Sequence, residues 1–319
     1  MSNITSEITK KLQENISRSL FGKEEQIKTF LCAFFSGGHV LLEDVPGTGK
    51  TSLVRALADS FGGEYKRVQF TPDLLPSDIT GINYYRQNTG DFALRQGPVF
   101  TNLFLADEIN RATPRTQSAL LECMEERQVT IDGETLPLPD VFMVMATMNP
   151  LEFQGTFPLP EAQVDRFMMK LHLGYPDAEG ECRIVEKICT GAKAETVDPV
   201  MDPVVTMDEV RAARAEIENV HISPAVADYM VRLIRATREQ EKIKLGVSPR
   251  GVVAMTRASR AWAAMHGRDH VLPDDVKALA VPVLSHRIIT RTNSSLQMSQ
   301  SCESLIEYLL TKVPVVLDS

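Results

Sequence analysis

The chain has 319 residues, of which 43% are hydrophobic and 24% are charged, as in a soluble globular protein long enough for two domains. Its net charge of −8 gives no general support for binding to nucleic acid, because proteins of that kind usually carry a basic face. The five cysteines are odd in number and form no C-x-x-C pair, which fits a reduced cytoplasmic environment and disfavours a zinc site. Neither an export signal nor a run of about 18 apolar residues is present, so no membrane segment is expected.

The first elements expected along the chain are two helices and a strand. Polar and apolar residues alternate with helical spacing over about 6–18 and again over about 23–36. The short apolar run at 39–43 then predicts the first strand of a buried parallel sheet.

A glycine-rich loop follows that strand and leads into a helix that is expected to end near Ser60. Gly47 and Gly49 let backbone N–H groups turn toward a phosphate, and Lys50 can reach the β- and γ-oxygens of a nucleotide. The Thr51 hydroxyl is placed to bind a magnesium ion. We therefore expect ATP and Mg²⁺ as ligands, and the expected cofactor-binding residues are Pro46, Gly47, Thr48, Gly49, Lys50 and Thr51.

One residue departs from the full phosphate-loop pattern. The pattern G-x-x-x-x-G-K-[ST] has glycine at the position of Asp44. We expect the Asp44 carboxylate to point to solvent or to cap a neighbouring N–H, rather than to face the phosphates.

Two further strands are expected to end in polar side chains. A strand is predicted over 64–70, and the apolar run 103–106 leads directly into Asp107 and Glu108. Parallel sheets bind ligands at the carboxyl ends of their strands, so Asp107 is expected to hold magnesium and Glu108 to polarise the attacking water. A third run, 141–147, precedes Asn149, whose amide can orient that water.

Turn residues predict two hairpins, one about 88–91 and one at Asp132-Gly133. Beyond residue 175 the pattern becomes helical. Helix starts are indicated by a capping box at Thr206 and by the pairs Ser223-Pro224 and Ser248-Pro249. Another is expected at Pro273.

Several motifs, in this order and at this spacing, carry a family resemblance: DEINRA at 107–112, ATMNP at 146–150, LPEAQVDRF at 159–167 and SPR at 248–250. The chain resembles the MoxR family of AAA+ ATPases over nearly its whole length. The resemblance implies an α/β P-loop core with a parallel five-stranded sheet flanked by helices over residues 1–174, and an all-helical lid over 175–319. It also implies a homo-oligomeric ring, usually a hexamer, with ATP at the subunit boundaries.

The same resemblance implies roles for two arginines. Arg166 would be an arginine finger acting in the neighbouring subunit, and Arg250 would be the sensor 2 residue of a lid that closes over the nucleotide. A guanidinium suits both roles because it contacts phosphate oxygens bidentately. A surface salt bridge with Asp165 or Glu161 is the alternative for Arg166. The expected catalytic set is Glu108, Asn149, Arg166 and Arg250.

The leading functional hypothesis is a MoxR-type ATPase that remodels, assembles or matures partner proteins, often ones with a von Willebrand factor A domain. A metal-chelatase-type motor subunit and a DNA-acting motor or transcription activator are the alternatives. A nucleotide-binding scaffold without turnover is disfavoured by the complete set of catalytic side chains. The first hairpin corresponds to the family's helix-2 insert, so Tyr84, Tyr85 and Phe92 contact a client or pack on their own subunit.

Overall fold

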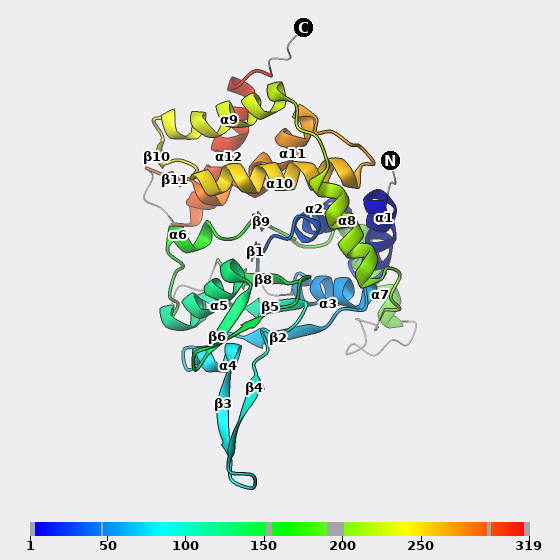
Figure 1. Ribbon diagram of the computed structural model, residues 1–319. Coiled ribbons are helices and arrows are strands. Elements are labelled where there is room, and N and C mark those ends of the chain that lie inside the picture. Colours follow the sequence, from blue (N-terminus) through cyan, green and yellow to red (C-terminus); the bar gives the residue numbers. More distant parts are fainter. Residues whose placement is uncertain (1–3, 46, 151–154, 190–200, 292–294, 316–319) are drawn as a thin grey trace.

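The computed structural model describes residues 4–45, 47–150, 155–189, 201–291 and 295–315 (Figure 1). Within these ranges, no helix has both the length and the apolar content that crossing a bilayer requires. The molecule has a central sheet with helices on both faces, a long projecting hairpin at one end and a helical lid at the other (Figure 1).

The central sheet is parallel and has five strands in the order β2-β5-β8-β1-β9. Their bounds are β1 (Val40–Glu43), β2 (Tyr65–Gln69), β5 (Leu103–Asp107), β8 (Met143–Met148) and β9 (Met169–Leu171). The apolar runs that predicted β1, β5 and β8 are buried on both faces of the sheet, as parallel strands covered by helices must be. The predicted α/β fold with a five-stranded parallel sheet is confirmed.

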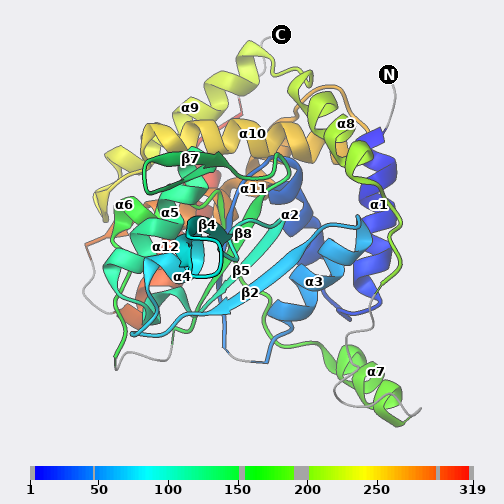
Figure 2. The same ribbon diagram turned by 60° about the horizontal axis from the view of Figure 1, so that its bottom comes forward.

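Alternate side chains of the strands enter two separate apolar cores. Val40, Leu42 and Leu105 pack on the side that holds α1 (Ile4–Ser17), α2 (Glu24–Phe35) and α3 (Lys50–Ser60). Leu41 and Phe104 point to the other side, where α4 (Pro76–Thr80), the short helix η1 (Ile109–Arg111) and α5 (Pro114–Glu126) lie. Helices therefore cover both faces of the sheet (Figure 2).

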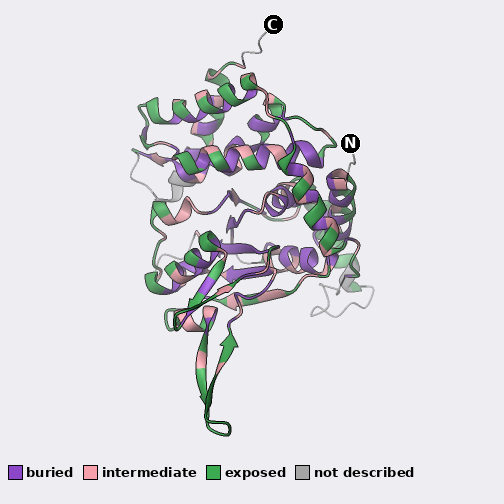
Figure 3. Cartoon of the chain, viewed as in Figure 1, coloured by how far each residue is buried: buried purple, intermediate pink, exposed green. Residues whose placement is uncertain are grey.

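Both predicted hairpins are present. Strands β3 (Gly81–Arg86) and β4 (Asp91–Gln96) form the projecting hairpin, and β6 (Gln128–Ile131) and β7 (Glu134–Pro137) form the shorter one. The second turn has positive φ at Asp132 (49°) and Gly133 (88°), which explains why an Asp-Gly pair stands there. Most of the projecting hairpin is exposed (Figure 3).

The chain after β9 is mostly helical, with α7 (Ala178–Cys189), α8 (Met207–Glu218), α9 (Pro224–Glu239), α10 (Pro249–Met265), α11 (Pro273–Leu284) and α12 (Ser295–Lys312), and with the short helix η3 (Ser285–Arg287). Helices α9 to α12 form the lid at the end of the molecule opposite the projecting hairpin (Figure 1). The side chains of Thr206, Ser223 and Ser248 accept the expected N-cap hydrogen bonds. A short antiparallel pair, β10 (Ile243–Leu245) with β11 (Ile289–Thr290), was not expected from the sequence. One short helix, α6 (Glu161–Val164), precedes β9.

Candidate active site

The glycine-rich loop joins β1 to α3 with the conformation that its glycines were expected to allow. Gly47 and Gly49 have φ of 86° and 87°, a region in which a Cβ would be strained. Lys50 is the first residue of α3, so unpaired N–H groups of the helix start lie at the loop. Pro46 lies outside the described residues.

A cavity of about 430 Å³ adjoins the loop. It brings together seven of the predicted site residues, which come from three separate segments of the chain. Its lining is Gly47, Gly49, Lys50, Thr51, Ser52, Arg67, Gln69, Asp107, Glu108 and Asn149. Thr48 is not part of this lining and is buried, with its hydroxyl 3.4 Å from the Val45 carbonyl oxygen.

Asp107 is held at the end of β5 by two neighbouring strands. Its Oδ1 accepts a hydrogen bond from the Thr147 hydroxyl at 2.7 Å, and its Oδ2 accepts from the Arg67 guanidinium at 2.6 Å. The Thr147 hydroxyl oxygen in turn accepts from the backbone N–H of Glu108 at 2.8 Å. One threonine on β8 therefore fixes both acidic residues.

Glu108 has a backbone conformation that is unusual for its residue type. Its φ and ψ of 56° and 53° lie in the left-handed region, which costs free energy for a residue with a Cβ. Its carboxylate accepts from Gln69 Nε2 at 2.6 Å and pairs with Arg111 at 3.0 Å. The strained turn directs the carboxylate into the cavity, where these two partners hold it.

Lys50 is half-buried and bonds to the loop entry. Its Nζ donates to the backbone carbonyl oxygen of Asp44 at 2.7 Å. Burial lowers the pKa of Lys50, and the nearby Asp44, Asp107 and Glu108 charges act in the opposite direction. The lining carries two basic side chains, Lys50 and Arg67, and two acidic ones, Asp107 and Glu108, which suits an anion accompanied by a metal cation.

The residues of the cavity fit a magnesium ion. The Thr51 hydroxyl and the Asp107 carboxylate are oxygen donors of the kind that Mg²⁺ takes, and both line the same cavity. Among the described residues, no group of three or more His, Cys, Asp or Glu side chains could hold a metal.

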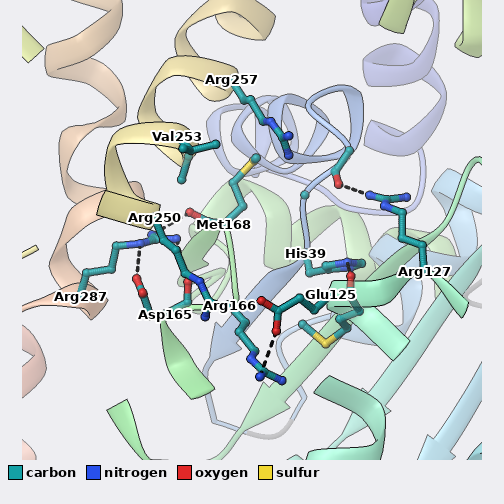
Figure 4. A pocket seen from close by; sticks show the side chains of 14 residues that line it. His39, Glu125, Arg127, Asp165, Arg166, Met168, Arg250, Val253, Arg257 and Arg287 are labelled. Atoms are coloured by element: carbon teal, nitrogen blue, oxygen red, sulfur yellow. Dashed lines mark hydrogen bonds and ion pairs between the residues drawn. The ribbon is translucent and has the colours of Figure 1, made fainter. Parts of the chain in front are cut away.

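The two predicted arginines lie in a different cavity, of about 270 Å³ (Figure 4). Arg166 precedes β9 in the core, and Arg250 lies in the first turn of α10 in the lid. Both pair with one carboxylate: Arg166 with Glu125 Oε2 at 2.9 Å, and Arg250 with Glu125 Oε1. The sequence offered a salt bridge of Arg166 with Asp165 or Glu161, but the carboxylate that Arg166 pairs with is that of Glu125.

Further charged side chains hold this arginine cluster in place. Asp165 pairs with the buried Arg287 at 2.9 Å and accepts from the Ser248 hydroxyl, the cap of α10, at 2.8 Å. Burial lowers the pKa of Arg287 to about 10, against the opposing effect of Asp165. The first turn of α10 is thereby fastened to the core next to Arg166.

The two cavities lie at opposite ends of β1. Gly37, Gly38 and His39, which line the arginine cavity, directly precede the strand, whereas the glycine-rich loop directly follows it. Arg166 also precedes β9, which pairs in parallel with β1 from Val40 onward. Arg166 and Arg250 therefore do not share a cavity with Lys50 of their own chain.

The fold and the glycine-rich loop are those of a P-loop ATPase of the AAA type. The model of the ATPase family associated with various cellular activities (AAA) matches residues 39–169, and the model of the AAA lid domain matches residues 235–305. A solved structure from Cytophaga hutchinsonii superposes with a TM-score of 0.87 at 39% identity, and the match covers 98% of this chain and 96% of that one.

Sequence relatives narrow the class. Chaperone MoxR1 of Mycobacterium tuberculosis is 41% identical over 93% of this chain and 80% of its own length. Protein MoxR of Methylorubrum extorquens is 30% identical over 95% and 94%, and the uncharacterized protein YeaC of Bacillus subtilis is 45% identical over 96% and 94%. The chain belongs to the MoxR family of AAA+ ATPases.

Three residues that hold Asp107 and Glu108 in place were not anticipated from the sequence. Arg67 and Gln69 alternate on β2, and Gln69 stands beside Asp107 in the strand register. Thr147 lies within the apolar run of β8. The alternation on β2 is a usable signal, but the register that brings these side chains to the acids is not visible in the sequence.

Proposed function

We propose that this chain binds ATP with its phosphates at the glycine-rich loop and hydrolyses the terminal phosphoanhydride bond. The observation that carries the proposal is the single cavity shared by Lys50, Thr51, Asp107, Glu108 and Asn149. Membership of an AAA ATPase family supports ATP hydrolysis in general. The relatives that match over nearly the whole chain carry a MoxR name or no functional name, so they lend the chelatase and DNA-motor alternatives no support.

In this proposal the side chains divide the work. Lys50 leaves the Asp44 carbonyl to contact the β- and γ-oxygens, while the N–H groups at the start of α3 hold the phosphate chain. Glu108 accepts a proton from the attacking water, and Asn149 orients that water. Thr51 and Asp107 would hold Mg²⁺, which supplies charge neutralisation at the phosphates when bound.

We further propose that the arginine cluster serves the nucleotide of a neighbouring subunit. Arg166 and Arg250 lie in a cavity at the far end of β1 from their own loop, so a second chain must present its nucleotide to them. The pairing with Glu125 supports a joint role, because one carboxylate places both guanidinium groups at the same surface. A homo-oligomeric ring, for which six subunits are usual, satisfies this arrangement.

The remodelling activity is proposed from the family and from the projecting hairpin. Tyr84, Tyr85 and Phe92 are 41%, 55% and 72% exposed, so each ring keeps surface that another protein can contact. The ring of Phe92 lies 5.4 Å from that of Tyr85. We propose that these rings contact a client protein, with a von Willebrand factor A domain protein as the first candidate, while residues 1–174 act as the motor and 175–319 as the lid.

The basic test compares ATP binding and hydrolysis in three chains. Lys50→Ala should weaken ATP binding, whereas Glu108→Gln should bind ATP and lose about 10²–10⁴-fold in rate. Titration calorimetry measures the affinity for ATP, and the release of phosphate measures the rate of hydrolysis. Wild-type turnover by Glu108→Gln in a clean preparation would show that Glu108 is not the base.

Client identity is tested with the same variant. Glu108→Gln loaded with ATP should retain a client that can be identified by mass spectrometry, and Lys50→Ala is the matched control that should not. Retention of the same proteins by both variants would count against an ATP-dependent client.

A further inference from the structure

Asp44, the residue that departs from the phosphate-loop pattern, is buried and not directed to solvent. Only 7% of its surface is exposed. Its Oδ2 accepts the backbone N–H of Leu173, and its Oδ1 accepts the backbone N–H of Gly174 at 3.2 Å. Of the two placements expected from the sequence, the carboxylate adopts the one that caps neighbouring N–H groups.

These two N–H groups belong to the segment that connects the core to the lid. The segment begins after β9 ends at Leu171, and Gly174 has φ of 63°, where a residue with a Cβ would be strained. One residue further, the carbonyl oxygen of Tyr175 accepts a hydrogen bond from the buried ammonium of Lys23. Asp44 supplies two of the bonds that fix this connection, at its glycine turn.

The backbone of the same residue contacts the phosphate loop. The Asp44 N–H donates to the Met148 carbonyl oxygen at 3.1 Å, which extends the pairing of β1 with β8. Its carbonyl oxygen accepts the Lys50 ammonium at 2.7 Å. Asp44 alone therefore links the Lys50 ammonium, which bonds its carbonyl oxygen, to the core–lid connection, which bonds its carboxylate.

We propose that Asp44 is a positioning residue that couples occupancy of the phosphate loop to the position of the lid. The proposal rests on ATP binding at this loop. Phosphates compete with the Asp44 carbonyl for Lys50, and the same residue's carboxylate holds Leu173 and Gly174. Binding at the loop thereby changes the restraint on the connection, and by linkage the lid position changes the affinity for ATP.

A second contact between core and lid lies beside this one. Glu43 precedes Asp44, and its carbonyl oxygen accepts from His172 Nδ1 at 2.6 Å. The other nitrogen of His172 bonds to Glu303 of α12 at 3.1 Å. The chain at the end of β1 therefore meets the segment after β9 at two places, and one of them reaches α12 through His172, which supports this end of the strand as the path of the coupling.

The test uses Asp44→Asn, because an amide has one acceptor oxygen and presents its NH₂ group to the second backbone N–H. Spin labels are placed at Glu122→Cys on α5 and Ala227→Cys on α9, both exposed positions, with Cys182 and Cys189 replaced by Ser. All chains carry Glu108→Gln to prevent turnover. The label-to-label distance is measured with and without ATP.

With Asp44 intact, ATP should shift the distance distribution. Asp44→Asn should bind ATP within about fivefold of the parent affinity, yet show less than half of that shift. The proposal is overturned if Asp44→Asn retains the full shift, or if the parent chain binds ATP without any shift. Absence of ATP binding in the parent would instead defeat the proposed function.

Asp275→Asn is the matched control for loss of a buried carboxylate. Asp275 is 4% exposed, accepts the Leu272 N–H at 2.8 Å and pairs with Arg268 within the lid. It should lower the thermal midpoint but keep the ATP-dependent shift. If it abolishes the shift as Asp44→Asn does, the effect is general destabilisation and the proposal fails.

A measurement on the unmodified chain covers the case in which Asp44→Asn does not fold. Amide hydrogen exchange at Leu173 and Gly174 should change when ATP is added, whereas exchange at Leu272, bonded to Asp275, should not. Unchanged exchange at Leu173 and Gly174 in the ATP-bound protein would contradict the coupling.

Discussion

Replacing Arg166 by Ala tests whether the site is completed by a second chain. Four residues of β1, at about 3.3 Å each, place roughly 13 Å of strand between the arginine cavity and the start of the phosphate loop. The Arg166 side chain extends from the far end of that strand, so we expect it to act on the nucleotide of a neighbouring subunit and not on one bound at its own Lys50. Loss of a finger donated by a neighbour costs about 10³–10⁵-fold in rate, or about 4–7 kcal/mol of transition-state stabilisation.

The assay mixes two inactive chains, Arg166→Ala and Lys50→Ala. In randomly mixed rings about a quarter of the interfaces pair an intact Lys50 site with an intact Arg166, because each contact is head-to-tail. ATP hydrolysis should therefore return to a substantial fraction of that of the unmodified protein. Arg166→Ala mixed with the Arg166→Ala/Lys50→Ala double variant is the control and should stay inactive. No recovery in rings shown by native mass spectrometry to be mixed would refute the trans arrangement.

Three further predictions follow from contacts around the site. Thr147→Val removes the hydroxyl that bonds to Asp107 and to the Glu108 N–H. The loss of about 1–3 kcal/mol should lower kcat/KM for ATP roughly 5- to 150-fold. Thr147→Ser should keep the activity, and equal loss in both variants would contradict this. The bond to Glu303 raises the pKa of His172, so its stabilisation is complete below about pH 6.5 and is lost as pH rises through the higher folded-state pKa. His172→Gln should therefore cost up to about 1 kcal/mol more in urea unfolding at about pH 5.5 than at about pH 9, and the opposite order would exclude this pair as the cause. Burial lowers the pKa of His39 to about 3, so ¹⁵N NMR should show a neutral ring from about pH 5 to 8. The proton should lie on Nε2, because Nδ1 accepts a backbone N–H. A titration of this ring in that pH range would contradict the assignment.

Features that depend on residues close together in the chain were predictable from the sequence. Gly47 and Gly49 indicate positive φ, and the Asp132-Gly133 pair indicates a tight turn. Ser223 and Ser248 indicate helix starts. Each of these residues acts through its own backbone or through the next turn of the chain. The apolar runs identify the buried strands for the same reason, since burial on both faces removes the polar alternation. These signals predicted three of the buried strands and the residues of the central cavity, whereas the five-stranded parallel sheet was expected from the family resemblance.

The tertiary structure alone decided which distant side chains meet. Glu125 joins Arg166 to Arg250 although the three lie on two core segments and a lid helix. Gln69 reaches Glu108 only because β2 pairs with β5 in one register. Such contacts depend on strand order, register and the docking of the lid, which are set by packing over the whole chain and leave no periodic trace in the sequence.

Asp44 shows the division most clearly. As a sequence letter it is a missing glycine at the loop entry, and local chemistry allows its carboxylate to face solvent or to cap an N–H. The position of β9 decides between them. This strand ends beside β1, and the chain turns at Gly174 just beyond it, so two backbone N–H groups meet the buried carboxylate. A buried carboxylate is stable only with such partners, and partners 129 and 130 residues away are supplied by the fold.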